Sequence, residues 1–169
     1  MNLKEFFDYK NQFVEDILTS ESIVKLINEN VSVEDAESLM YTQVFPLEYI
    51  PDTVEDAKTY VCVDVDVIGS SDPSRKTFLS PVIYVWVMTH RSLMRLPDGG
   101  VRVDKLCAEI CDKMNGSRKY GLGELNLYAA KRFAPMTDYN GRVLSFYTRD
   151  FSRVYDGTKP IPSNRKVGV

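Results

Sequence analysis

The sequence is poor in the side chains that most often carry out chemistry. It has one histidine, three cysteines and one tryptophan. Ser92 stands two residues from His90, which on a strand makes it a neighbour and not a member of a catalytic triad. Cys107 and Cys111 share one face of a predicted helix, Cys62 lies on a predicted strand, and no metal-site or disulfide spacing links them. We therefore expect buried free thiols and no catalytic residue, metal or cofactor.

An excess of positive charge and long apolar runs are also missing. The chain has 21 lysines and arginines against 24 aspartates and glutamates, so its formal net charge is -3 at pH 7. A general nucleic-acid binder usually has a basic excess. The apolar runs are far shorter than the roughly 18 residues of a membrane span, and no charged-then-apolar signal segment opens the chain. We expect a protein folded in the cytoplasm, without membrane contact.

The length of 169 residues predicts one domain. We assign residues 1–151 to a single α+β domain, with a helical part over 1–40 and a sheet core over 60–151. Residues 152–169 form an arm that is rich in proline, glycine and charge and cannot bury a core of its own. We expect a neighbouring chain to order this arm.

Two segments precede the sheet core. Apolar residues at helical spacing between Phe13 and Ile27, and a short helix ending at Leu39, predict helices that pack on the sheet. The aromatic stretch 41–51 contains two prolines, which remove backbone donors. It therefore favours an edge strand or an extended connector.

Two strands open the core. Over 60–68 four valines line one face, whereas Asp64 and Asp66 lie on the other, as in a half-buried antiparallel strand. The strand over 81–89, which includes Trp86, is apolar on both faces. Such a strand is either central in its sheet or covered on both sides, by helix on one and by a neighbouring subunit on the other.

An amphipathic helix and two further strands complete the core. Apolar residues between 103 and 114 form a full core-facing stripe. Strands are predicted over 125–133 and 142–151, joined by a connector over 135–141 that is too long for a two-residue hairpin and supplies positive φ angles. The sequence thus predicts an α+β fold: a mixed, largely antiparallel sheet with a ββαββ core, flanked by an N-terminal helix and the central amphipathic helix.

One pattern suggests a metal-dependent enzyme. Asp64 and Asp66 direct two carboxylates to one strand face, as a magnesium-dependent nuclease or transferase requires. A two-metal site needs further acids, and only Asp150 is available as a loose candidate. Exposed acids on one sheet face are common, so the structural interpretation is favoured.

A second pattern is a basic loop over 116–123. It places Arg118 and Lys119 between glycines but lacks the spacing and the strand-to-helix context of a phosphate loop. A flexible loop that faces an acidic partner or a DNA backbone fits its charge. An ordinary solvated loop is the alternative.

Element order and two short phrases over 13–151 resemble the tail-terminator and neck proteins of long-tailed bacteriophages and phage-tail-like particles. The phrases are Val-Phe-Pro-Leu-Glu-Tyr-Ile-Pro at 44–51 and Tyr-Asn-Gly-Arg-Val-Leu-Ser-Phe at 139–146. The resemblance implies a structural protein of the virion tail or neck, assembled in the host cytoplasm, whose hexameric ring caps the tail tube, stops its polymerisation and joins it to the head connector. It implies copies of itself, the tail tube protein and head connector or neck proteins as partners, with DNA in the lumen as a further candidate.

The arm and the aromatic connector depart from that family, which leaves a neighbouring head-completion or stopper protein as the alternative. A small magnesium-dependent nuclease and a monomeric adaptor domain are rival hypotheses. If a ring forms, complementary charges and an apolar strand face would meet across a heterologous contact. The predicted interface residues are Asp64, Asp66, Trp86, Arg118, Lys119, Arg142 and Arg149.

Overall fold

The structure is a computed structural model that describes residues 3–51, 57–69, 78–120, 123–148 and 152–153. Its helices are α1 (Leu3–Leu18), α2 (Glu21–Ile27) and α3 (Arg102–Met114), with short 3-10 turns η1 (Ala36–Leu39) and η3 (Arg91–Leu93). Its strands are β1 (Val44–Phe45), β2 (Thr59–Gly69), β3 (Phe78–His90), β4 (Leu125–Met136), β5 (Tyr139–Thr148) and β6 (Ser152–Arg153).

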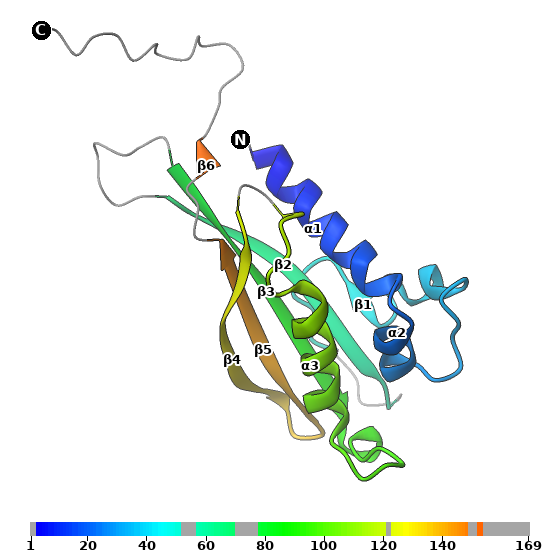
Figure 1. Ribbon diagram of the computed structural model, residues 1–169. Coiled ribbons are helices and arrows are strands. Elements are labelled where there is room, and N and C mark those ends of the chain that lie inside the picture. Colours follow the sequence, from blue (N-terminus) through cyan, green and yellow to red (C-terminus); the bar gives the residue numbers. More distant parts are fainter. Residues whose placement is uncertain (1–2, 52–56, 70–77, 121–122, 149–151, 154–169) are drawn as a thin grey trace, which may run out of the picture.

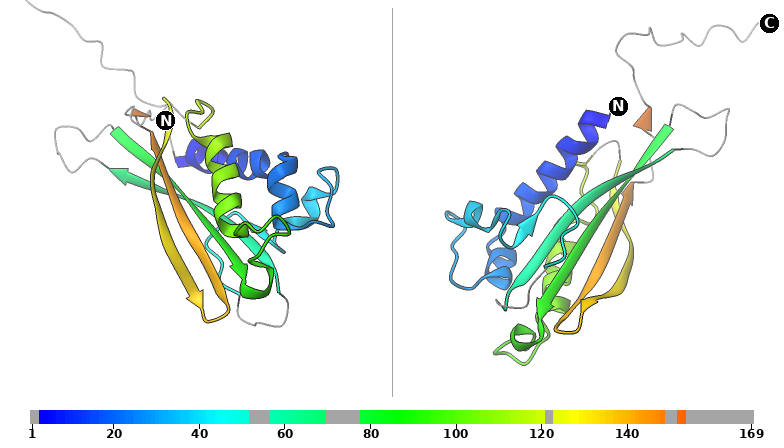
Figure 2. Two further views of the ribbon diagram at one scale, coloured as in Figure 1. Left: turned by 60° about the horizontal axis from the view of Figure 1, so that its bottom comes forward. Right: turned by 180° about the vertical axis from the view of Figure 1, so that it is seen from behind.

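The strands form one mixed sheet in the order β1-β2-β3-β5-β4, and β6 pairs with β3. β1 runs parallel to β2, while the other pairs are antiparallel. Helices α1, α2 and α3 all lie on one side of this sheet (Figures 1 and 2). The predicted α+β fold, with its ββαββ core and flanking helices, is confirmed.

The main core lies between the sheet and the helix layer. Alternation along β3 turns Ile83, Val85 and Val87 toward the helices, where all three are buried. The predicted stripe of α3 and the buried face of α1 pack against them. β3 is thus central in the sheet, which is one of the two alternatives that its sequence predicted.

A smaller cluster covers one end of the opposite face. Phe45, Tyr60, Cys62, Met88 and Tyr139 are buried there. The connector after β1 supplies the cover, because the Tyr49 ring stacks on that of Phe45 with centroids 4.0 Å apart. The aromatic stretch over 41–51 is therefore an extended connector that contains the short strand β1. Its prolines predicted an edge strand or such a connector.

The predicted thiols are buried in two of three cases. Cys62 and Cys107 are buried free cysteines, whereas Cys111 is partly exposed. Burial raises the pKa of the Cys62 and Cys107 thiols to about 12. At neutral pH both are protonated and behave as small apolar side chains.

The predicted ends of the last two strands are wrong. β4 continues to Met136 and β5 begins at Tyr139, so a two-residue turn joins them in place of a long connector. A register shift between Phe133 and Met136 absorbs Pro135. β4 is an edge strand, where a proline that lacks a backbone donor is tolerated. The arm beyond residue 153 lies outside the described residues.

Gly141 serves close packing and not a turn. Tyr41 is the only described non-glycine residue with a positive φ. Gly141 has no positive φ either, so the turn geometry predicted for it is absent. A Cβ atom at Gly141 would lie 1.9 Å from the carbonyl oxygen of Val87 and 2.9 Å from the Cα of Met88. Only glycine lets β5 approach β3 at this point.

We expect Gly141→Ala to lower the free energy of unfolding by about 2 kcal/mol or more, because the clash involves backbone that cannot move aside. Gly100→Ala is the matched control. Its added Cβ would lie 3.3 Å from Asp98 Oδ1, at the end of an exposed side chain, and 3.7 Å from Leu96 Cδ1, so no backbone atom is in the way. Urea unfolding of both variants checks this, and equal stabilities would contradict the packing role of Gly141.

Candidate subunit interface

The sheet face opposite the helices is only partly covered. Alternation and register place one set of β2, β3 and β5 side chains on it, beyond the small aromatic cluster. Seen from behind, no described helix lies over this part of the sheet (Figure 2, right). We call it the open face, and it comprises Asp64, Asp66, Val82, Tyr84, Trp86, Tyr128, Val143 and Tyr147.

Aromatic rings dominate the open face. The rings of Tyr84 and Trp86 lie with centroids 5.7 Å apart. Tyr128, at a register shift of β4, packs edge-on against Tyr147, also at 5.7 Å. The Tyr128 side chain is 74% exposed. Exposed tyrosine and tryptophan are the side chains most enriched at the centres of protein interfaces.

The free edges of the sheet are poorly suited to pairing with another chain. β4 carries two register shifts, Pro135, and the exposed charges Lys131 and Arg132. On β2 the Asp64 carboxylate accepts a hydrogen bond of 2.9 Å from the backbone N–H of Val65. Bulges, charges, proline and occupied donors all discourage strand addition. A partner would therefore cover the open face and not extend the sheet.

Three of the predicted interface charges are paired within the chain. Lys10 Nζ on α1 lies 3.2 Å from Asp64 Oδ1. Arg142 Nε lies 2.7 Å from Asp104 Oδ1 on α3. Lys119 Nζ lies 3.2 Å from Asp16 Oδ1 on α1.

The other predicted residues are placed differently. Trp86 is half-buried on the open face, and Asp66 is exposed on the same face. Arg118 is exposed in the loop before β4. Arg149, and Asp150 of the nuclease hypothesis, lie outside the described residues. The structure thus brings Asp64, Asp66 and Trp86 to one face but places Arg118, Lys119 and Arg142 elsewhere.

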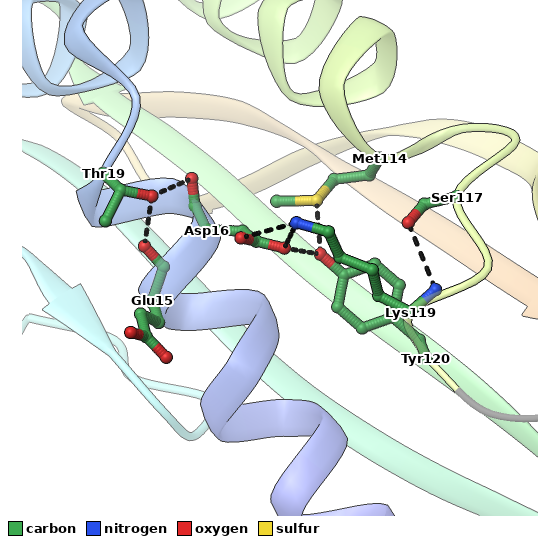
Figure 3. Close-up of polar contacts among 7 residues, drawn as sticks. All are labelled: Glu15, Asp16, Thr19, Met114, Ser117, Lys119 and Tyr120. Carbon is green, nitrogen blue, oxygen red and sulfur yellow. Dashed lines mark hydrogen bonds and ion pairs between the residues drawn. The ribbon is translucent and has the colours of Figure 1, made fainter.

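The loop before β4 is anchored by a contact that the sequence did not reveal. The Tyr120 hydroxyl donates a hydrogen bond of 2.5 Å to Asp16 Oδ2 on α1, and Lys119 Nζ lies 3.2 Å from Asp16 Oδ1 (Figure 3). The hydroxyl also lies 3.0 Å from Met114 Sδ at the end of α3. An aromatic residue inside a glycine-rich polar loop was the one available signal.

This contact joins α1, α3 and the loop. Tyr120 is 1% exposed. Burial and the neighbouring Asp16 carboxylate raise the pKa of Tyr120 well above its usual value, so the phenol remains a neutral donor. The loop was predicted to be flexible and basic or simply solvated, whereas its Lys119 and Tyr120 side chains are bonded to Asp16 of α1.

The aspartate pair of the nuclease hypothesis lies on β2. Asp64 is engaged by Lys10, and the two predicted carboxylates have no third metal-binding side chain beside them: among the described residues no three His, Cys, Asp or Glu side chains cluster.

No helix in the described part of the chain is long and apolar enough to cross a membrane.

Comparison with known proteins gives a family. A family model described as YomW matches residues 7–148, which is most of the chain, so the protein belongs to the YomW family. The family name is that of a phage-derived, SPBc2-like protein and indicates a phage-related protein. No curated protein matches the sequence.

We expect Tyr120→Phe to lower the free energy of unfolding by about 1–3 kcal/mol, because it removes the hydroxyl donor from the buried Asp16 carboxylate. Lys119→Met is the matched control. The Lys119 side chain is 62% exposed, and exposed ion pairs contribute only about 0–1 kcal/mol. Chemical unfolding at neutral pH measures both variants.

The pH dependence gives a second readout. A phenol whose folded-state pKa is raised stabilises the fold fully below the unfolded pKa of about 10, and this stabilisation is lost as the pH rises above it. The stability difference between the parent protein and Tyr120→Phe should therefore shrink above that pH. Equal losses in the tyrosine and lysine variants, with no alkaline convergence, would contradict the anchoring role.

Proposed function

We propose that this phage-related protein is a tail terminator: a non-catalytic virion protein whose ring caps the tail tube, stops its polymerisation and joins the tube to the head connector. The open face supports this proposal most directly. It carries two aromatic pairs, of which Tyr128 is exposed and the other three rings are half-buried, on a chain whose central strand is apolar on both sides. A ring is one assembly in which every copy covers this face with a different surface of its neighbour.

In this proposal apolar contacts stabilise the ring, and charges set the orientation of one subunit against the next. Asp64, Lys119 and Arg142 already have partners within the chain, so they contribute less across subunits than separate charges would. Asp66 and Arg118 are exposed at different parts of the surface. Opposite charges in such positions favour one orientation of a head-to-tail contact.

A head-completion or stopper protein is the alternative from the same class. It would share the covered sheet face but bind the head connector and not the tube end. The two functions therefore differ in partner and not in the architecture of the subunit. Binding to purified tail tubes distinguishes them.

We expect the purified full chain to form a ring with about six times the chain mass of 19.3 kDa, seen by light scattering and by negative-stain imaging at tube ends. Tyr128→Lys should prevent ring formation, because it places a charge at the most exposed ring of the open face. The fold should survive, since an edge strand tolerates lysine.

The control is Val101→Lys, which introduces the same charge at a side chain that is 45% exposed directly before α3, in the helix layer. This variant should assemble as the parent does. A stable monomer that ignores tail tubes, or rings that form equally well with Tyr128→Lys, would contradict the proposal. Rings that bind connectors but not tubes would favour the stopper protein.

A further inference from the structure

A groove of about 610 Å³ lies between α1 and the segment around η1. Its apolar floor comes from both elements: Val14 and Ala36 are buried, and Leu18 and Met40 are half-buried. This groove belongs to the helix layer and is separate from the open face of the sheet. Nothing in the proposed ring contact uses it.

The rim of the groove is acidic. Glu15, Glu34 and Glu37 line it and are exposed, and no lysine, arginine or histidine is found among its described lining residues. A groove with an apolar floor and a negatively charged rim fits an extended segment that carries both apolar and basic side chains.

Tyr41 stands at the same rim in an unusual conformation. It has a φ of 57°, in the left-handed region that bulky residues rarely adopt, and its side chain is 64% exposed. Its backbone N–H donates to the carbonyl oxygen of Val44, which helps to hold this geometry. Strained residues of this kind are concentrated where a protein holds a ligand or a segment. Here the strain presents an aromatic ring at the groove.

We propose that residues 154–169 of the same chain bind in this groove. Their sequence has three basic residues, Lys159, Arg165 and Lys166, against the single acid Asp156. Ile161 stands between two prolines, and proline-rich segments bind aromatic-lined grooves at a low cost in entropy. The segment therefore offers apolar side chains to the floor of the groove and basic side chains to its acidic rim.

The distances permit binding within one chain. β6, which precedes the segment, lies beside the start of α1 in all three views (Figures 1 and 2). From Leu3 to Glu15 the helix rises about 18 Å, whereas sixteen extended residues span roughly 53 Å. The segment can reach the groove and still lie along it. A short tether also raises its effective concentration far above that of a neighbouring copy.

The bound segment would brace α1 against η1 and cover the half-buried floor. From the sequence we expect a neighbouring chain to order the arm. The groove offers the arm a binding site within its own chain instead. The contact forms in a single copy, so it does not depend on ring assembly.

Photo-crosslinking in the full chain tests this proposal. Tyr41 is replaced by photoreactive benzoylphenylalanine, and an equal mixture of ¹⁴N- and ¹⁵N-labelled chains is irradiated at a concentration below that of self-association. Mass spectrometry should find crosslinks from position 41 to residues 154–169 with one isotope label per product. The same group at Tyr128, on the open face, should give no crosslink to that segment.

Charge variants test the recognition. Glu34→Lys with Glu37→Lys should lower the crosslink yield about five-fold, as expected when two surface charge contacts become repulsive. Changing Lys159, Arg165 and Lys166 to glutamate in that variant should restore it. Asp112→Lys with Glu124→Lys alters two exposed acids outside the groove and should change nothing.

Three results would overturn the proposal. The first is no crosslink from position 41 to residues 154–169 while thermal unfolding shows an intact fold. The second is mixed-isotope products alone, which would assign the groove to the segment of a neighbouring copy. The third is equal yields in all charge variants, which would leave no role for the glutamates.

Discussion

The structure depends on the need to bury a central strand that is apolar on both faces. β3 turns Ile83, Val85 and Val87 to one side and Tyr84, Trp86 and Met88 to the other. Among the described residues, three helices cover the first side but only a short aromatic connector covers part of the second. A sheet with apolar residues on both faces requires cover on both. The unequal cover leaves an apolar surface, and the proposed assembly follows from it.

Polar contacts make the helix layer a firm support for this surface. Arg102, at the start of α3, is buried and donates to the carbonyl oxygens of Leu26 at 2.9 Å and Leu93 at 2.8 Å, while it pairs with Glu29 at 2.7 Å. This guanidinium joins α2, α3 and η3, as the Tyr120 contact joins α1 to the loop before β4. These contacts lie within the chain and fix the helix layer. The helix layer in turn supports the sheet that carries the open face.

Much of the fold was predictable because it follows from periodicity. The alternation of β2, the two-sided apolar pattern of β3 and the stripe of α3 depend only on local spacing and on burial. The ends of β4 and β5 were not predictable, since Pro135 reads as a break unless the strand is known to lie at an edge. The need for glycine at position 141 likewise arises from the approach of a strand distant in sequence.

The candidate site was predicted less completely. Trp86, Asp64 and Asp66 were correctly assigned to β2 and β3, because strand alternation alone places them. The ion pairs of Asp64, Lys119 and Arg142 join residues that are 38 to 103 positions apart, so no local pattern could show that these charges are engaged. The exposed Tyr128 was missed, because its orientation depends on a register shift in β4.

The chain's single tryptophan allows the central claim to be measured directly, since Trp86 lies on the open face. Its fluorescence can be recorded over a concentration series, together with acrylamide quenching and the mass from light scattering. If the open face is the subunit interface, the emission shifts to shorter wavelength and quenching weakens at the concentration where the mass rises. If rings form while the emission and quenching of Trp86 stay constant, the subunits meet through another surface and the account is wrong.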